Sequence, residues 1–272
     1  MHSITGVNVK IQDFRFMTGG KFVKRFSSED VPLLAPVDIR GKGNARALLL
    51  LHGFSSSPAV FRAMHPAITG YDAVVCPVLP GHADSIATFA KSTSIEWLAA
   101  ATDACEGLID NYQTVYVLGF SLGGLLACHL SQRYALNRLY LLAPSLSLHI
   151  NVPVALCAAR VLQGLGLRRL RNRAGNLYTH RYPELAYRQQ PLTTIIQILT
   201  LINDFSFLPP HCPTDLFLGR FDAVVDSKQV AERFKNLPHV TTHWLEHSAH
   251  VLPLDGDMEA IVACVNASPH RL

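Results

Sequence analysis

Short segments made only of apolar residues recur along the chain and predict the strands of a buried sheet. They cover residues 47–51, 73–76, 115–118, 139–142 and 216–218. Because polar residues do not alternate within them, we expect each strand to be covered on both faces, as in a parallel sheet flanked by helices. Before them, residues 7–26 alternate polar and apolar positions on either side of Thr18-Gly19-Gly20, a pattern that predicts a β-hairpin.

Helical periodicity follows most of these strands. The predicted helices cover residues 94–112, 123–134, 227–237 and 258–265, with a further strand at 240–245. The first helix is expected to begin at a serine cap, Ser94, and to carry one apolar stripe made of Ile95, Leu98, Ala99, Thr102, Cys105, Leu108 and Ile109. The alternation of strand and helix predicts an α/β fold with a mostly parallel, doubly wound central sheet.

This alternation stops between residues 145 and 210. Helix-like patterns at 152–165 and 191–205 follow one another there without a predicted strand between them. We expect this segment to be a helical cap insertion over the site, so that residues 1–144 and 211–272 form the core. The run Ile195, Ile196, Ile198, Leu199, Leu201 and Ile202 could line an acyl-chain pocket, or pack the cap on the core.

Composition narrows the class of protein. The chain has 272 residues, of which 49% are hydrophobic and 16% charged, enough for one α/β domain with an insertion. Its net charge of +4 is too small to indicate nucleic-acid binding. The densest basic run, residues 168–173, is interpreted as a solvated helix end or loop. A weak contact with acidic head groups or a membrane surface is the alternative.

The six cysteines show no C-x-x-C spacing, and the histidines show no regular ligand spacing with cysteine or carboxylates, so no metal and no cofactor is expected. Reduced thiols favour a cytoplasmic location. Residues 1–6 lack the features of a secretory signal. The uncharged stretch 111–132 is interpreted as a strand and a buried helix, so we expect no transmembrane segment.

The most informative motif is G-x-S-x-G at residues 119–123. It follows one predicted strand and opens a predicted helix, which is the context of a nucleophile elbow. In such a turn the central residue, Ser121, is strained and exposed above the sheet, and the flanking glycines avoid collisions across the turn. Ser121 is therefore the candidate nucleophile.

A serine hydroxyl needs a base, and the base needs an acid that fixes its tautomer. Asp222 follows the strand at 216–218 and is the preferred acid. Asp226 competes, but Asp226-Ser227-Lys228-Gln229 is typical of a helix start, with Asp226 as N-cap and Gln229 as its reciprocal partner. His250 follows the strand at 240–245 and is the preferred base. His247 is the alternative, while His243 and His239 do not lie at the strand's exit.

The transition state also needs donors for the developing oxyanion. The backbone N–H of Leu122, the residue after the nucleophile, is one candidate. Phe54, in the loop that follows the strand at 47–51, is the other, and Gly53 allows close approach there.

Together these residues resemble the α/β-hydrolase superfamily from about residue 47 to residue 265, and more narrowly its small carboxylesterase and monoacylglycerol lipase branch. The segments that carry the resemblance are 50–54, 77–82, 119–124, 219–222 and 248–251, with Asp255 after the last. The resemblance implies Ser121, Asp222 and His250 as the triad, Phe54 and Leu122 as oxyanion donors, and a helical cap. Ala249 and Ala83 depart from the family, which often has glycine at both positions.

We therefore expect a serine hydrolase that cleaves carboxylic esters through an acyl-enzyme. The expected partner is a small-molecule ester with an apolar acyl chain. A thioesterase or lysophospholipase on the same triad stays open, as does a non-catalytic binding protein on a hydrolase scaffold. The natural substrate, the acyl chain length and the oligomeric state stay open as well.

Overall fold

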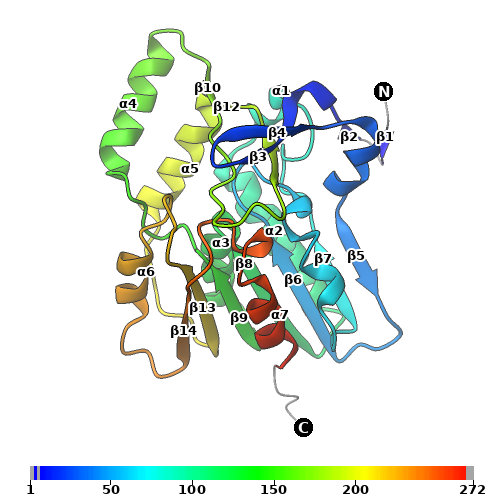
Figure 1. Cartoon of the computed structure of the whole chain (residues 1–272). Helices are drawn as coiled ribbons and strands as arrows, with labels where there is room; N and C mark the ends of the chain where they lie inside the picture. The colour runs from blue at the N-terminus through cyan, green and yellow to red at the C-terminus, as the bar shows by residue number, and fades with distance from the viewer. Residues whose placement is uncertain (1–2, 5–6, 268–272) are drawn as a thin grey trace.

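A seven-stranded sheet in the order β14-β13-β9-β8-β6-β7-β5 forms the centre of the computed structural model, which describes residues 3–4 and 7–267. Neighbouring strands are parallel, except that β5 runs antiparallel to β7 (Figure 1). The strands are β5 (Val37–Arg40), β6 (Arg46–Leu51), β7 (Ala73–Cys76), β8 (Thr114–Phe120), β9 (Arg138–Leu142), β13 (Thr214–Gly219) and β14 (Val240–Leu245). The predicted α/β fold with a mostly parallel sheet is confirmed. The prediction for residues 1–6 falls mostly outside the described positions.

The apolar strands separate two hydrophobic cores because successive side chains point to opposite faces. In β6, Leu49 and Leu51 contribute to one core, and Leu48 and Leu50 contribute to the other. All four side chains are fully buried. This burial on both faces is the physical reason why the strand sequence contains no polar alternation.

Helices cover both faces of the sheet. The core that contains Leu49 also receives side chains from α1 (Ile86–Phe89), α2 (Ser94–Ile109), α3 (Leu122–Ser131) and α6 (Ser227–Phe234). The opposite core receives them from α7 (Met258–Asn266). Short 3₁₀ helices connect these elements: η1 (Ile11–Asp13), η2 (Ser28–Leu34), η3 (Pro58–Phe61), η4 (His65–Ala67) and η5 (Leu252–Leu254).

The start and the buried face of α2 differ from the prediction. Thr93, not Ser94, is the N-cap, and it forms a capping box with Glu96. The buried side chains are Trp97, Ala101, Cys105 and Leu108, whereas Ile95 is 77% exposed. Trp97 accounts for which face of α2 is buried, because its indole lies in the core and donates a hydrogen bond of 3.1 Å to the Pro80 carbonyl.

The predicted amino-terminal hairpin is present but shorter than residues 7–26. It consists of β3 (Phe14–Thr18) and β4 (Lys21–Arg25), and Gly19 and Gly20 adopt positive φ in its turn. Before it lie two very short strands, β1 (Ser3–Ile4) and β2 (Val7–Asn8). The hairpin is extended by β11 (Glu184–Tyr187), which pairs antiparallel with β3. Two segments that are far apart in sequence therefore share one small sheet.

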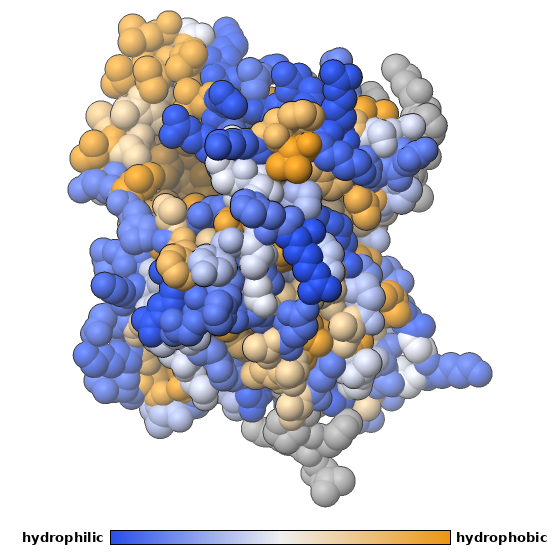
Figure 2. Space-filling view, viewed as in Figure 1, coloured by the Kyte–Doolittle hydropathy of each residue, from blue (hydrophilic) through white to orange (hydrophobic). Residues whose placement is uncertain are grey.

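Residues 145–210 contain the two predicted helices, α4 (Val152–Gly164) and α5 (Leu192–Asp204), which pack against each other. The prediction of no strand between them is wrong, because β10 (Arg169–Arg171), β11 and β12 (Gln189–Pro191) lie there. Such short strands have too few positions to show an alternation of polar and apolar residues. In addition, β11 pairs with β3, which is distant in the sequence. The outer part of α4 projects from the body and exposes apolar side chains (Figures 1 and 2).

Candidate active site

Ser121 lies at the sharp turn between β8 and α3, with φ of 53° and ψ of −113°. This left-handed conformation is strained for a residue with a side chain. The turn requires glycine on both sides: a Cβ at position 119 would lie 2.2 Å from the Gly123 carbonyl oxygen, and one at position 123 would lie 2.0 Å from that of Leu51. The elbow geometry that the motif predicts is therefore present. The predicted exposure of Ser121 is wrong, because the serine lines a cavity and is only 7% exposed.

The structure brings Ser121, His250 and Asp222 together. Nε2 of His250 lies 3.1 Å from the Ser121 hydroxyl, and Nδ1 lies 2.9 Å from Oδ2 of Asp222. A carboxylate at Nδ1 favours the tautomer in which Nδ1–H donates and Nε2 accepts the serine proton. Burial alone would lower the pKa of His250, but the charge and hydrogen bond of Asp222, with the charge of Glu184, raise it above its usual value.

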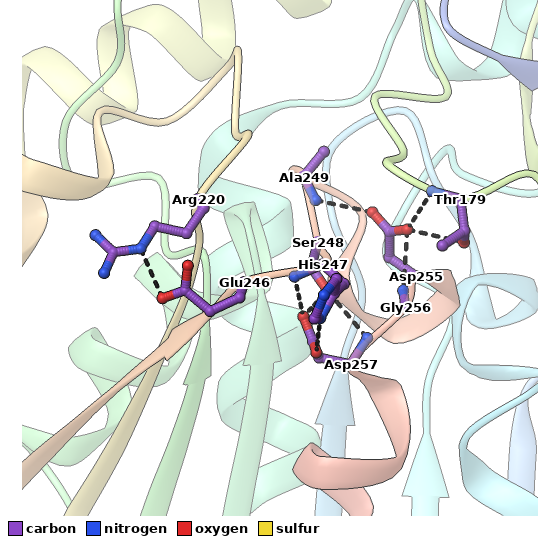
Figure 3. Close-up of polar contacts among 9 residues, drawn as sticks. All are labelled: Thr179, Arg220, Glu246, His247, Ser248, Ala249, Asp255, Gly256 and Asp257. Carbon is purple, nitrogen blue, oxygen red and sulfur yellow. Dashed lines mark hydrogen bonds and ion pairs between the residues drawn. The ribbon is translucent and has the colours of Figure 1, made fainter.

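The loop that carries His250 is fixed by two aspartates (Figure 3). The Asp255 carboxylate accepts the backbone N–H of Ala249 at 2.8 Å and also those of Tyr178 and Thr179, at 2.7 and 2.8 Å. Asp257 accepts from the backbone N–H of His247 at 2.7 Å and from the hydroxyl of Ser248 at 2.9 Å. The histidine therefore sits in a loop that is tied both to the start of α7 and to Tyr178 and Thr179 in the segment 145–210.

The competing acid and bases lie elsewhere. Asp226 caps α6 as predicted, accepting the Gln229 N–H at 3.0 Å, but the Gln229 amide donates to the Asp226 carboxylate rather than closing a reciprocal bond to its backbone. His247 is exposed and faces Asp257 at 3.4 Å. His243 pairs with Asp215, and Nε2 of His239 contacts the Pro210 carbonyl at 2.7 Å. These histidines and Asp226 all have partners outside the elbow.

The two expected oxyanion donors border the nucleophile. Leu122 is the first residue of α3, so its N–H is one of those that have no partner within the helix. Phe54 and Ser121 line the same cavity. The turn at Phe54 is held by His52, which accepts the Leu79 N–H at 3.1 Å, and burial lowers the pKa of His52 to about 4. A neutral histidine therefore fixes the loop without adding charge beside the nucleophile.

Ser121 and His250 line a cavity of 390 Å³ with two different walls. One wall is apolar and is made of Leu148, Ile198, Leu199, Ile202 and Val224. The other is polar and is made of Arg171, Asn172, Arg173, Glu184 and Gln190. Of the isoleucines and leucines for which the sequence left two roles open, Ile198, Leu199 and Ile202 reach the cavity.

Two cavity residues were missed by the sequence analysis. The hydroxyl of Ser145 lies 3.0 Å from that of Ser121. Its place directly beyond β9, at the same edge of the sheet, was a signal that could have found it. Glu184 is buried and accepts the Gly175 N–H, and it is the only carboxylate side chain between Asp110 and Asp204. Burial raises the pKa of Glu184, against the opposing influence of the Gly175 hydrogen bond and of nearby His250 and Arg62.

A group of possible metal ligands lies away from this cavity. Ligand atoms of Asp215, His243 and Cys264 lie within 4.8 Å of one another. However, Arg138 pairs with the Asp215 carboxylate at 2.6 Å, and its positive charge disfavours a cation there. This group also lies at the start of β13, whereas Asp222 follows the end of that strand.

The fold and the site are those of a hydrolase with a serine at its elbow. Residues 48–263 match the alpha/beta hydrolase family, and the chain belongs to this family. Within it, the resemblance to the small esterase and monoacylglycerol lipase branch is confirmed. The chain is 25% identical to a thermostable monoacylglycerol lipase of Bacillus sp. (strain H-257) over 242 residues, which are 86% of this chain and 95% of that protein.

One further relative and two solved structures are also named as esterases or lipolytic enzymes. A pimeloyl-[acyl-carrier protein] methyl ester esterase of Neisseria meningitidis is 37% identical over 89 residues, 33% of this chain and 26% of that protein. A solved structure from work on two metagenome-derived lipolytic enzymes, LipS and LipT, has a TM-score of 0.72 and 25% identity, covering 86% of this chain and 96% of that chain. Monoacylglycerol lipase from Paleococcus ferrophilus shares the fold with a TM-score of 0.63 at 15% identity, over 86% and 98% of the chains.

The apolar stretch at 111–132 forms β8 and the buried helix α3, as predicted. Among the residues that the structure describes, no helix combines the length and the apolar character needed to cross a membrane.

Proposed function

We propose that this chain is a serine esterase that hydrolyses carboxylic esters, with Ser121 as nucleophile, His250 as base and Asp222 as the acid that orients it. The observation that carries this proposal is the unbroken hydrogen-bonded chain from Asp222 through His250 to Ser121, at a cavity with an apolar wall. The similarity to a monoacylglycerol lipase over most of both chains supports the same reaction class.

In the proposed reaction the Ser121 hydroxyl attacks the ester carbonyl while Nε2 of His250 takes its proton. The backbone N–H groups of Phe54 and Leu122 stabilise the oxyanion that forms. His250 then protonates the leaving alcohol, and an acyl-enzyme remains on Ser121. Water, activated by the same imidazole, attacks the acyl group and releases the carboxylic acid. The raised pKa of His250 suits a group that accepts a proton and then donates it to the leaving alcohol.

We further propose that residues 145–210 act as a cap on a core made of residues 1–144 and 211–272. The apolar side chains that α5 contributes to the cavity, Ile198, Leu199 and Ile202, support a role in holding an apolar acyl chain. The strands β10, β11 and β12 make this cap a mixed structure rather than a purely helical one. The hairpin β3–β4 is attached to it through β11.

A cytoplasmic location is proposed on the cysteines alone. All six are free thiols, and Cys76, Cys105, Cys128 and Cys212 are buried. Free thiols are typical of proteins from reducing compartments.

Two measurements test the proposal. A fluorophosphonate should label the wild-type protein at Ser121, and Ser121→Ala should abolish both labelling and hydrolysis of p-nitrophenyl butyrate. The substitution should keep the fold, because the hydroxyl lies at a turn and not in the core, and circular dichroism checks this. Undiminished hydrolysis by Ser121→Ala would refute the assignment. A panel of acyl esters of different chain lengths, with monoacylglycerol and lysophospholipid, then defines the substrate.

A further inference from the structure

Several arginines meet on the surface beside the cavity, and we call this surface the arginine groove. Its members are Arg15, Arg25, Arg171, Arg173 and Arg188. Strand pairing places Arg15 directly opposite Arg25 across β3 and β4. The Nη1 atoms of Arg15 and Arg188 both donate to the carbonyl oxygen of Gln12, at 3.3 and 3.4 Å, so these two guanidinium groups are close neighbours.

None of the ion pairs found among the described residues includes any member of the arginine groove. Like charges that face each other across an antiparallel pair destabilise it. Burial lowers the pKa of Arg15, and repulsion from Arg188 and Arg25 lowers it further. The fold therefore maintains a repulsive arrangement that an anion would relieve.

The arginine groove adjoins the candidate active site. Arg15, Arg171 and Arg188 line a hollow of 380 Å³, and Arg171 and Asn172 line both this hollow and the active-site cavity. Asn172 is buried, and its side-chain amide donates to the hydroxyl of Ser55, at 3.2 Å, beside the proposed oxyanion donor Phe54. The active-site cavity and this hollow are therefore neighbours that share two lining residues.

The two walls of the cavity orient such a ligand. The apolar wall, with Ile198 and Ile202 from α5, suits the acyl chain of an ester. Arg171 belongs both to the polar wall and to the arginine groove, so a leaving group that lies along the polar wall is the part of the substrate nearest the positive charges. Glu184 also belongs to the polar wall, but its carboxylate is engaged by the Gly175 N–H.

We propose that the arginine groove binds a phosphate group on the leaving alcohol or thiol, so that the enzyme acts on phosphorylated acyl esters or thioesters. This inference rests on the proposed function. The planar guanidinium groups can each donate two parallel hydrogen bonds to phosphate oxygens. In the reaction the Ser121 oxygen bonds to the acyl carbon as the bond to the leaving oxygen or sulfur breaks. The serine proton passes through His250 to the leaving atom, and the phosphate keeps all its bonds.

The test uses substrate pairs that differ only in the phosphate. One pair is 1-octanoylglycerol and 1-octanoylglycerol 3-phosphate, and the other is S-octanoyl-pantetheine and its 4′-phosphate. We expect kcat/KM to favour the phosphorylated member by about tenfold or more in at least one pair, and the preference to shrink as salt is added. The pair that shows the preference identifies whether the phosphate belongs to a glycerol phosphate or to a phosphopantetheine arm. Equal kcat/KM within both pairs would overturn the inference.

Matched variants locate the effect. Arg171→Gln/Arg188→Gln should reduce the preference for the phosphorylated member to about one third or less of the wild-type value. Arg160→Gln/Arg233→Gln removes the same charge from α4 and α6, away from the arginine groove, and should keep the preference. If both double variants lose it equally, the effect comes from net charge and the inference is wrong. Thermal unfolding checks that each variant folds.

Binding measurements distinguish a failure of this inference from a failure of the proposed function. In Ser121→Ala, titration calorimetry should show tighter binding of the phosphorylated member of the preferred pair than of its partner. If this preference appears but the wild type hydrolyses neither member, the phosphate site stands and the proposed function fails. If the wild type hydrolyses both members equally and Ser121→Ala binds them equally, the proposed function stands and the phosphate site fails.

Discussion

Replacing Asp222 with asparagine has a consequence that the structure specifies atom by atom. Oδ1 of Asp222 accepts the backbone N–H groups of Val224 and Val225, each at 2.8 Å, while Oδ2 faces Nδ1 of His250 at 2.9 Å. In Asp222→Asn the amide oxygen must stay at the Oδ1 position, because an NH₂ group there would face two donors. The NH₂ group therefore replaces Oδ2 and donates to Nδ1 of His250.

A histidine that accepts a hydrogen bond at Nδ1 carries its proton on Nε2. That atom lies 3.1 Å from the Ser121 hydroxyl and can then no longer take the serine proton. We expect kcat for p-nitrophenyl butyrate to fall about 10⁴-fold, the size seen when a triad histidine is held in the wrong tautomer. This loss corresponds to about 5.5 kcal/mol of activation free energy. KM should change little, since the interaction acts in the transition state.

Asp226→Asn is the matched control. Asp226 caps α6 by accepting the Gln229 N–H at 3.0 Å, and asparagine is as good an N-cap as aspartate. We expect wild-type kcat and a melting temperature close to that of the wild type. A loss of less than about tenfold for Asp222→Asn would refute the tautomer argument. A larger loss for Asp226→Asn than for Asp222→Asn would show that the wrong acid was assigned.

Three further predictions concern the residues in and around this site. Because the pKa of His250 is raised and the base must be neutral to accept a proton, kcat/KM should fall with decreasing pH through a midpoint above the ordinary histidine value of about 6.5. Glu184→Gln removes a charge that raises this pKa, so its pH profile should shift to lower pH, and an unshifted profile would contradict this coupling. Asp255→Ala should lower the free energy of unfolding by about 3 kcal/mol or more in urea titrations, because the buried carboxylate accepts hydrogen bonds from four backbone N–H groups and a hydroxyl. A loss below about 1 kcal/mol would show that water replaces these bonds.

Local patterns in the sequence were sufficient for the six parallel strands of the central sheet, most helices and the three residues that meet at the elbow. Continuous apolar segments indicate burial on both faces of a strand, as for Leu48 to Leu51. This pattern can be recognised without knowing which strand lies beside it. The order of Ser121, Asp222 and His250, each directly beyond a predicted strand, indicated one edge of the sheet. The choice of Asp222 over Asp226 depended on a capping pattern that is also local.

The sequence by itself determined which residues could form the elbow, the relay and the sheet, because each candidate lies within a short motif or directly beyond an apolar segment. Such signals span only a few positions. Only the tertiary structure decided that β11 joins β3, that Ser145 and Glu184 line the cavity, and that Arg15 meets Arg188. These contacts join segments separated by many residues, and no periodicity records them. Their formation depends on the register of strands and on how residues 145–210 pack against the rest of the chain.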